Sequence, residues 1–298
     1  MNPRPLTPEV VKCSAFATSS ITDLLSNFER FCKVDRNLAP RTLSHNNGYP
    51  WQVRRLLESV GKHPSQVTAE DIRSYLIRFK TKSPSTYANV LKALKIFFRE
   101  FLKMPEVVES FKFPKRTYAP KTVPSKEDLR RYFDALDNDR DKALFLMYAT
   151  SGLRRNELLS LTVNDLDLEN RTIIPKNAHN GTTKSTWGTC FNVEAQTYLK
   201  NYLVSRESND DDRRLLRLAP VTVKRAFEKA SQKSGIKITP QVLRDWFCDQ
   251  LGLLGVPDRY VDAMCGRTPK SVLARHYSDF APQKLKTIYD KADLRILS

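Results

Sequence analysis

Residues 274–279 read ARHYSD, a run that places Tyr277 ten positions after Arg267. Two more arginines, Arg154 and Arg244, lie upstream in segments predicted to be a turn and a helix start. Cutting a phosphodiester without a metal requires an oxygen nucleophile and fixed cations aimed at the oxygens where charge develops. The guanidinium group suits this task, because its planar fork binds two phosphate oxygens and stays protonated at neutral pH. These residues therefore predict a phosphoryl-transfer site.

The composition indicates a polyanionic partner. The 298 residues include 50 lysines and arginines against 33 acidic residues, which gives a formal charge of +17, and the excess recurs along the chain. The length allows two domains of ordinary size with their own cores. A basic protein without a nucleic-acid role is the alternative that charge alone leaves open.

The cysteines and histidines predict neither a disulfide framework nor a metal site. The cysteines are odd in number, they have no CxxC spacing, and the four histidines form no ligand pattern with them. No uninterrupted apolar run approaches the length of a membrane span. We therefore expect a cytoplasmic protein of a reducing cell, without a membrane segment, metal or other cofactor. The cysteines are Cys13, Cys32, Cys190, Cys248 and Cys265.

The first third of the chain predicts a helical domain over residues 19–104, after a loose tail at 1–18. Apolar residues recur at helical spacing, Thr68 with Asp71 resembles a capping box, and Ser83 precedes a proline at a first helical position. The last of four expected helices carries cations on its other faces, which either contact a DNA backbone or form a solvated face. These cations are Lys92, Lys95 and Arg99.

A basic, proline-containing segment at residues 105–124 is the expected linker between the domains. It carries Lys112, Lys115 and Arg116, which either track a phosphate backbone or belong to an ordinary solvated connector.

The remaining residues, 125–298, predict a helical domain that includes a small β-sheet. Ser125 and Asp128 cap its first helix, and short extended segments are expected at 163–168, 171–175 and 184–192. The predicted fold class is therefore mainly α with a small β-sheet, in two domains.

Four boxes in the second domain carry a resemblance. They are Gly152-Leu153-Arg154 followed by Glu157, the run PQVLRDWF at 240–247 that contains Arg244, Cys265-Gly266-Arg267, and Tyr277. Their order and spacing resemble the tyrosine recombinases, the phage-type integrases and Xer-like recombinases, and most closely the integrases of archaeal plasmids and viruses. Two positions depart from the family pattern. Gln241 stands where a histidine is usual, and it can donate a hydrogen bond but cannot carry a proton. Arg267 stands where the family has histidine or tryptophan.

The resemblance implies a site-specific recombinase whose catalytic domain and helical core-binding domain close as a clamp around double-stranded DNA. Tyr277 would attack the scissile phosphate and form a 3′-phosphotyrosine without ATP or metal, while Arg154, Arg244 and Arg267 neutralise the phosphate. Lys184 on a β-hairpin would protonate the departing 5′-oxygen, with Lys176 as the alternative.

The resemblance also implies a homo-oligomer, a tetramer on DNA. Residues 282–298, which have helical spacing, are expected to pack into a neighbouring protomer, although packing on their own domain is the alternative.

Two other functions remain open at this point. A type IB topoisomerase uses the same tyrosine chemistry and relaxes supercoils. A DNA-binding protein that has lost cleavage is the second, which the residues at 241 and 267 favour.

Overall fold

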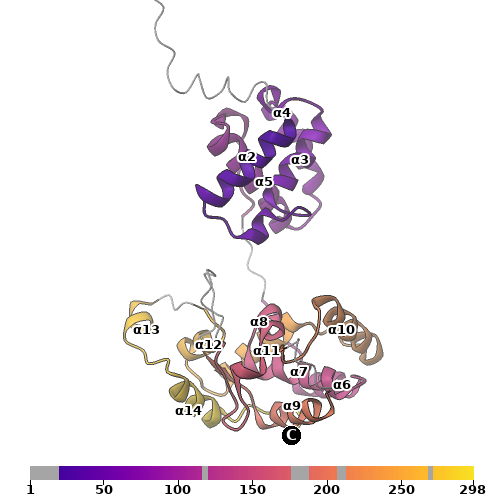
Figure 1. Cartoon of the computed structure of the whole chain (residues 1–298), viewed down its shortest axis with the longest axis vertical. Helices are drawn as coiled ribbons and strands as arrows, with labels where there is room; N and C mark the ends of the chain where they lie inside the picture. The colour runs from indigo at the N-terminus through magenta and orange to yellow at the C-terminus, as the bar shows by residue number, and fades with distance from the viewer. Residues whose placement is uncertain (1–19, 116–119, 176–187, 207–212, 268–270) are drawn as a thin grey trace, which may run out of the picture. The chain divides into compact units, whose positions relative to one another are not determined.

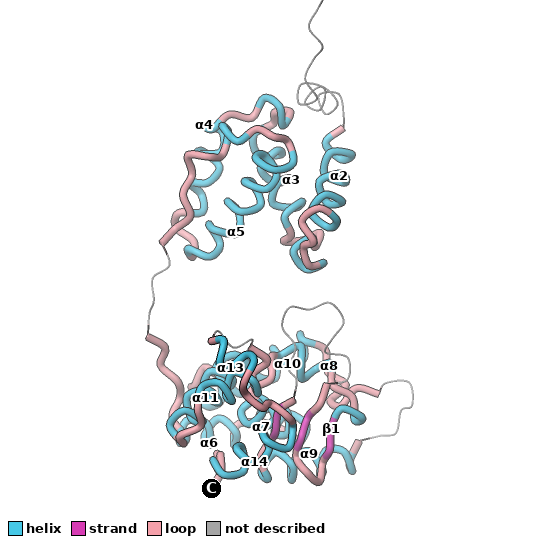
Figure 2. Tube along the Cα trace, turned by 90° about the vertical axis from the view of Figure 1, so that its left-hand side faces the viewer, coloured by secondary structure: helices cyan, strands magenta, loops and turns pink. Residues whose placement is uncertain are grey.

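The computed structural model describes residues 20–115, 120–175, 188–206, 213–267 and 271–298, apart from the side chain of Arg275. The chain divides into two compact units, Met1–Ala119 and Pro120–Ser298. Helices make up most of the described residues in each unit (Figures 1 and 2). Within the described ranges, none of the helices is both long and apolar enough to cross a bilayer.

The first unit is a helical bundle, and two of its helices begin at the predicted caps. The Thr68 side chain accepts from Asp71 N, and the Asp71 carboxylate accepts from Thr68 N, which confirms the capping box. The Ser83 cap is confirmed as well. The helices are α2 (Ile21–Val34), α3 (Tyr49–Val60), α4 (Ala69–Leu76) and α5 (Pro84–Lys95), and α5 continues as a π-helical turn, Ile96–Phe101.

The core of this unit forms where α2, α3 and α5 meet. Leu24 and Phe28 of α2 and Leu56 of α3 are fully buried. The rings of Phe28 and Phe97 meet edge to face, with their centroids 5.0 Å apart. Aromatic pairs in this geometry add to the stabilisation from apolar burial.

Part of the expected linker packs on the first unit. Pro105–Val107 forms a 3-10 turn, and Val107 and Val108 are buried in the core of the helical bundle. Further on, the Lys95 ammonium lies 5.7 Å from the centroid of the Phe113 ring. Residues 105–113 therefore pack with the helical unit, and the limits of the linker stay a prediction.

The second unit is built around a buried helix, α7. Its residues from Ala143 to Ser151 are all buried, and α9 and α11 pack against it. In Figure 1, α7 lies among α6, α8, α9 and α11. The helices are α6 (Lys126–Asp134), α7 (Asp139–Ser151), α8 (Arg155–Ser160), α9 (Val193–Ser205), α10 (Pro220–Ser234), α11 (Pro240–Leu253), α12 (Asp258–Met264), α13 (Val272–His276) and α14 (Pro282–Ala292).

A small antiparallel sheet lies beside the end of α7. Its order is β1-β2-β3, and Leu166 pairs with Ile173 while Thr172 pairs with Cys190. The Thr189 hydroxyl donates to Ser151 O at 2.7 Å, which joins the sheet to the last turn of α7. The strands are β1 (Leu166–Asp167), β2 (Thr172–Ile173) and β3 (Thr189–Cys190).

The first extended segment was predicted too long. Residues Val163–Asp165 form a 3-10 turn, because the Asp165 carboxylate accepts from Thr162 N at 2.8 Å and so closes a capping box there. The strand begins only at Leu166.

The C-terminal segment packs on its own unit, so the preferred expectation that it packs into a neighbouring protomer is wrong. Leu285 and Tyr289 of α14 are buried in the core of the second unit, and the Tyr289 hydroxyl donates to Thr150 O at 2.7 Å. The Glu194 carboxylate accepts from the backbone N atoms of Ile296 and Leu297. The apolar face of this helix is thus already covered within the chain.

Candidate active site: an arginine pocket

The site begins at a turn that only glycine fits. Gly152 ends α7 in the left-handed conformation, with φ of +66°. A Cβ at this position would lie 2.5 Å from Cε1 of Phe247 and 3.0 Å from the Cys265 sulfur. The close approach of α7, α11 and the end of α12 therefore depends on a missing side chain.

Arg154 follows this turn as the residue before α8. Its backbone N donates to Glu157 Oε2 at 2.8 Å, and its guanidinium forms an ion pair with the other carboxylate oxygen. Its Nη2 also reaches Gly266 O at 3.5 Å. The side chain is 30% exposed, so the guanidinium is held and still accessible.

Arg244 is the buried member of the group. It lies in the second turn of α11, which begins after the Thr239 cap, and only 3% of the residue is exposed. Its Nη1 donates to Gly152 O and its Nη2 to Cys265 O at 2.6 Å, while Glu157 Oε2 lies 3.9 Å from Nη1. Burial lowers the pKa of this guanidinium from its ordinary value. The two carbonyls and the carboxylate offset the cost of the buried charge.

Arg267 follows the Cys265-Gly266 turn and is the more exposed cation. Its Nη1 donates to Asp262 Oδ1 at 3.0 Å, its Nη2 contacts Cys248 Sγ at 3.5 Å, and the side chain is 41% exposed. Burial acts to lower the pKa of Arg267, but the negative charges of Cys248 and Asp262 outweigh it and raise the pKa overall.

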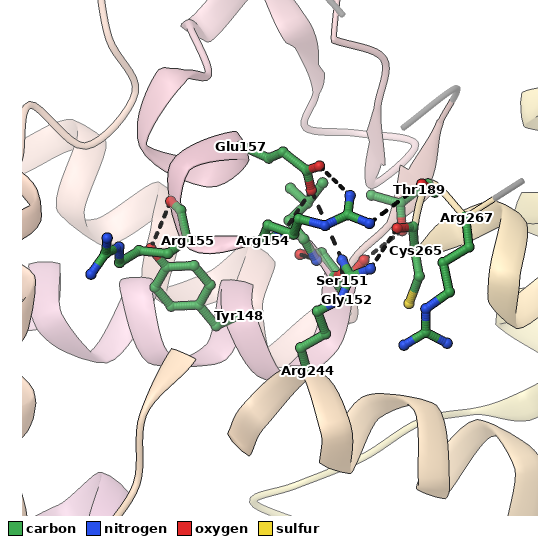
Figure 3. Close-up of polar contacts among 12 residues, drawn as sticks. Tyr148, Ser151, Gly152, Arg154, Arg155, Glu157, Thr189, Arg244, Cys265 and Arg267 are labelled. Carbon is green, nitrogen blue, oxygen red and sulfur yellow. Dashed lines mark hydrogen bonds and ion pairs between the residues drawn. The ribbon is translucent and has the colours of Figure 1, made fainter. Parts of the chain in front are cut away.

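We call the side chains of Arg154, Arg244 and Arg267 the arginine pocket. Figure 3 shows the guanidinium groups of Arg154 and Arg244 directed at Glu157 and at the carbonyls of the two turns, with Arg267 extending from the same turn as Cys265. The carboxylates of Glu157 and Asp262 and the Cys248 thiolate balance the charges of the three guanidinium groups, so an anion is bound through the N–H donors that these partners do not use.

Tyr277 is not among the groups that the structure brings together. It follows the last residue of α13, the residue is 78% exposed, and within the described part of the chain no hydrogen bond links it to the arginine pocket. Its backbone N donates to Leu273 O at 3.0 Å. The tyrosine is therefore accessible, and its role as the nucleophile stays a prediction.

Gln241 is likewise apart from the pocket. It is exposed in the first turn of α11, and its Nε2 donates to Asp245 Oδ1 at 2.9 Å. The other oxygen of Asp245 accepts from Lys121 Nζ at 2.7 Å. Both general-acid candidates, Lys184 and Lys176, lie outside the described residues.

The basic side chains of the first unit differ in their surroundings. Lys92, Lys112 and Lys115 are exposed and have no carboxylate partner in the part of the chain that the structure describes. Arg99 instead pairs with Glu100 Oε1 at 2.9 Å, and Lys95 lies over Phe113. Arg116 lies outside the described residues.

Sequence reasoning missed the groups that hold the arginines. Glu157 was read only as part of a motif, although its place three residues after Arg154 is a side-chain pairing distance on a helix. Cys248 lies four residues after Arg244 on α11, hence on the same face of the helix, and this spacing could have associated its thiol with the pocket.

Family models match both units. The model of the phage integrase family matches residues 125–284, and that of the phage integrase N-terminal SAM-like domain matches residues 24–106. The tyrosine recombinase XerA of Thermococcus onnurineus is 26% identical over 289 residues, which cover 92% of this chain and 97% of the relative.

Two solved structures have a similar fold. The Tn1549 transposon integrase in complex with circular intermediate DNA gives a TM-score of 0.62 at 17% identity, covering 89% of this chain and 98% of that one. The lambda integrase dimer bound to a COC′ core site gives 0.64 at 15% identity, covering 93% and 82%. The catalytic family model alone spans more than half of the chain, so the protein belongs to the phage integrase family and is a site-specific tyrosine recombinase.

Proposed function

We propose that this recombinase cuts and rejoins double-stranded DNA through a 3′-phosphotyrosine on Tyr277, with the scissile phosphate bound in the arginine pocket. The observation that carries the proposal is the convergence of Arg154, Arg244 and Arg267 from three separate segments on the turn at Cys265-Gly266. Such an arrangement fixes cations before substrate arrives, which is what stabilises a pentacoordinate phosphate at low reorganisation cost.

Each arginine contributes differently to phosphate binding. Arg244 uses two of its five N–H donors on backbone carbonyls, which fixes its position, and among the described residues it makes no further hydrogen bond. Arg154 and Arg267 are more exposed, and their free N–H groups bind the non-bridging oxygens. Removal of one such donor costs about 2–4 kcal/mol of barrier.

The tyrosine attacks once DNA has brought the phosphate and Tyr277 together. The hydroxyl is exposed and is not held by the pocket, so nothing within the pocket has to release it. The bond energy is kept in the phosphotyrosine, and the 5′-hydroxyl of a partner strand then attacks it. Lys184 supplies the proton to the departing 5′-oxygen, with Lys176 as the alternative donor.

We further propose that both units contact the duplex as a clamp and that four copies assemble on the recombining sites. The formal charge of +17 supports a polyanionic partner, and exposed Lys92, Lys112 and Lys115 offer cations to the backbone. The Tn1549 integrase complex with DNA and the lambda integrase dimer at its core site support DNA as the partner by analogy.

The test is covalent capture on labelled, nicked duplexes from the replicon that carries the gene. The protein is expected to become linked to a 3′ end, and Tyr277→Phe to abolish the adduct while binding DNA normally. Tyr198→Phe is the matched control, because it removes the same hydroxyl group from a tyrosine on α9, where the ring packs on Phe133. An undiminished adduct in Tyr277→Phe would reject the assignment.

Two further measurements, relaxation of supercoiled DNA and DNA binding, distinguish the other functions. Relaxation of supercoiled DNA without preference for a site would indicate a topoisomerase. Tight, sequence-specific binding with no adduct on any fragment would indicate a DNA-binding protein that has lost cleavage.

A second substrate identifies the general acid. A 5′-bridging phosphorothioate leaves as a thiolate, which needs no proton. The variant that lacks the general acid, Lys184→Ala or Lys176→Ala, is therefore expected to cleave the sulfur substrate at the wild-type rate and the oxygen substrate slowly. If a variant is slow on both substrates, the replaced lysine has a role other than proton donation to the departing oxygen.

A further inference from the structure

Two cysteines lie together directly beside the arginine pocket. Cys248 on α11 and Cys265 at the end of α12 have their sulfurs 3.4 Å apart. The same two residues hold the arginines, because Cys248 Sγ contacts Arg267 Nη2 at 3.5 Å and Cys265 O accepts from Arg244 Nη2 at 2.6 Å. Figure 3 shows the Cys265 sulfur next to the Arg267 side chain.

We propose that Cys248 and Cys265 are a peroxide-sensitive dithiol, and that their oxidation to a disulfide disables the arginine pocket. The regulatory part of this inference rests on the function proposed above. The disulfide itself is a property of the two side chains and can be measured without DNA.

The surroundings suit Cys248 for the first step. It is half-buried and so within reach of a small oxidant, whereas Cys265 is fully buried. A hydrogen bond from Cys265 and the charge of Arg267 lower the pKa of Cys248 to about 6 against the effect of burial. By contrast, burial raises the pKa of Cys32 and Cys190 to about 12. Thiolates react with peroxides and thiols do not, so among the four cysteines that the structure describes oxidation is selective for Cys248.

The chemistry balances with hydrogen peroxide as the oxidant. The Cys248 thiolate attacks one peroxide oxygen, the O–O bond breaks, and the released hydroxide takes a proton to become water. The resulting sulfenic acid is then attacked by the Cys265 sulfur. The S–S bond forms, the S–O bond breaks, and the departing hydroxide leaves as water with the Cys265 proton.

Closing the disulfide moves atoms that hold the pocket. A disulfide bond is about 2.05 Å long, so the sulfurs have to approach by roughly 1.3 Å from their separation of 3.4 Å. Cys265 is packed against the Gly152 turn, and the residues that follow it carry the Arg154 contact and Arg267 itself. Oxidation also removes the negative sulfur that Arg267 contacts. A misplacement of about 1 Å in a catalytic site can cost about 10²-fold in rate.

The experiment treats the full-length protein with hydrogen peroxide in a Cys13→Ser background, which removes a thiol outside the described residues. Intact mass is expected to fall by two hydrogen atoms, and peptide mapping to join Cys248 to Cys265. Adduct formation should fall by about tenfold or more and return with a dithiol reductant. Cys248→Ser is expected to lose this sensitivity when oxidised and reduced samples of the same variant are compared.

A third variant tests the order of the steps. In Cys265→Ser, the sulfenic acid on Cys248 has no partner thiol and should be trapped by a carbon nucleophile such as dimedone. If Cys248 is oxidised beyond the sulfenic acid and forms no disulfide in the protein that keeps both Cys248 and Cys265, the dithiol proposal is overturned. A disulfide that leaves adduct formation unchanged would also overturn it. If the reduced protein forms no adduct, the proposed cleavage function fails and the dithiol proposal is still tested. The affinity of the reduced and the oxidised protein for a nicked duplex is then compared in place of adduct formation.

Discussion

A single methyl group at Gly152 is expected to destabilise the second unit more than it would at any open glycine turn. In Gly152→Ala, the new Cβ meets the Phe247 ring at 2.5 Å, and Phe247 is fully buried and cannot swing out. The left-handed backbone, with φ of +66°, adds a separate cost for any residue that has a Cβ. The backbone term is about 1–2 kcal/mol and the overpacking term about 1–3 kcal/mol, so the expected loss of unfolding free energy is about 2–5 kcal/mol.

Gly235→Ala is the matched control for this substitution. Gly235 has φ of +73° in the same unit, and a Cβ there meets nothing within 4 Å. This variant should lose only the backbone term, about 1–2 kcal/mol. The difference between the two variants therefore isolates the contact with Phe247 and Cys265.

The assay is urea unfolding followed by tryptophan fluorescence in a Trp51→Phe background, which leaves the tryptophans of the second unit as probes. Shortening the opposing ring in Phe247→Leu should restore part of the stability of Gly152→Ala, since the two residues are in contact. Equal losses in Gly152→Ala and Gly235→Ala would refute the reasoning.

Three further predictions concern the pocket, the C-terminal helix and the first unit. The lysine in Arg244→Lys cannot reach both Gly152 O and Cys265 O, so the rate of adduct formation should fall by about 30- to 900-fold, equivalent to about 2–4 kcal/mol of barrier. Single-turnover kinetics measures this rate, and a loss below threefold would contradict the prediction. Tyr289→Phe removes the hydrogen bond to Thr150 O and should cost about 1 kcal/mol in urea unfolding, whereas an unchanged midpoint would show the bond to be neutral. Hydrogen bonds from Lys62 and Thr68 lower the pKa of Asp71 to about 2, so its contribution to stability is full above the unfolded pKa near 4 and is lost as pH falls through about 2. Asp71→Asn should therefore flatten the dependence of the melting temperature on pH between about 4 and 2, and an unaltered dependence would show that this carboxylate does not contribute.

Local signals in the sequence predicted the helix starts well. The caps at Thr68, Ser83 and Ser125 depend on residues within three positions of one another, and the structure confirms all three. The sheet was also expected, but its first strand was drawn too long because the Thr162 and Asp165 pairing was not recognised as a turn.

Contacts between distant residues could not be predicted in the same way. The hydrogen bond from Arg244 to Gly152 O joins positions 92 residues apart, and Arg244 is buried where this contact forms. The packing of α14 on its own unit includes a contact with Thr150 O, 139 residues before Tyr289. Helical spacing shows that such a segment has an apolar face, but it does not show which surface covers that face.

The shared carboxylate of Glu157 makes the two arginines interdependent under mutation. Its oxygens serve Arg154 and Arg244 together, so the cost of replacing one of the three residues depends on which of the others is still present. Replacing Glu157 first leaves the buried Arg244 without its counter-charge. This costs far more than replacing Glu157 in a variant that already has a neutral residue at position 244. The order of substitutions, and not only their number, therefore determines which variant sequences of this pocket remain folded along the way.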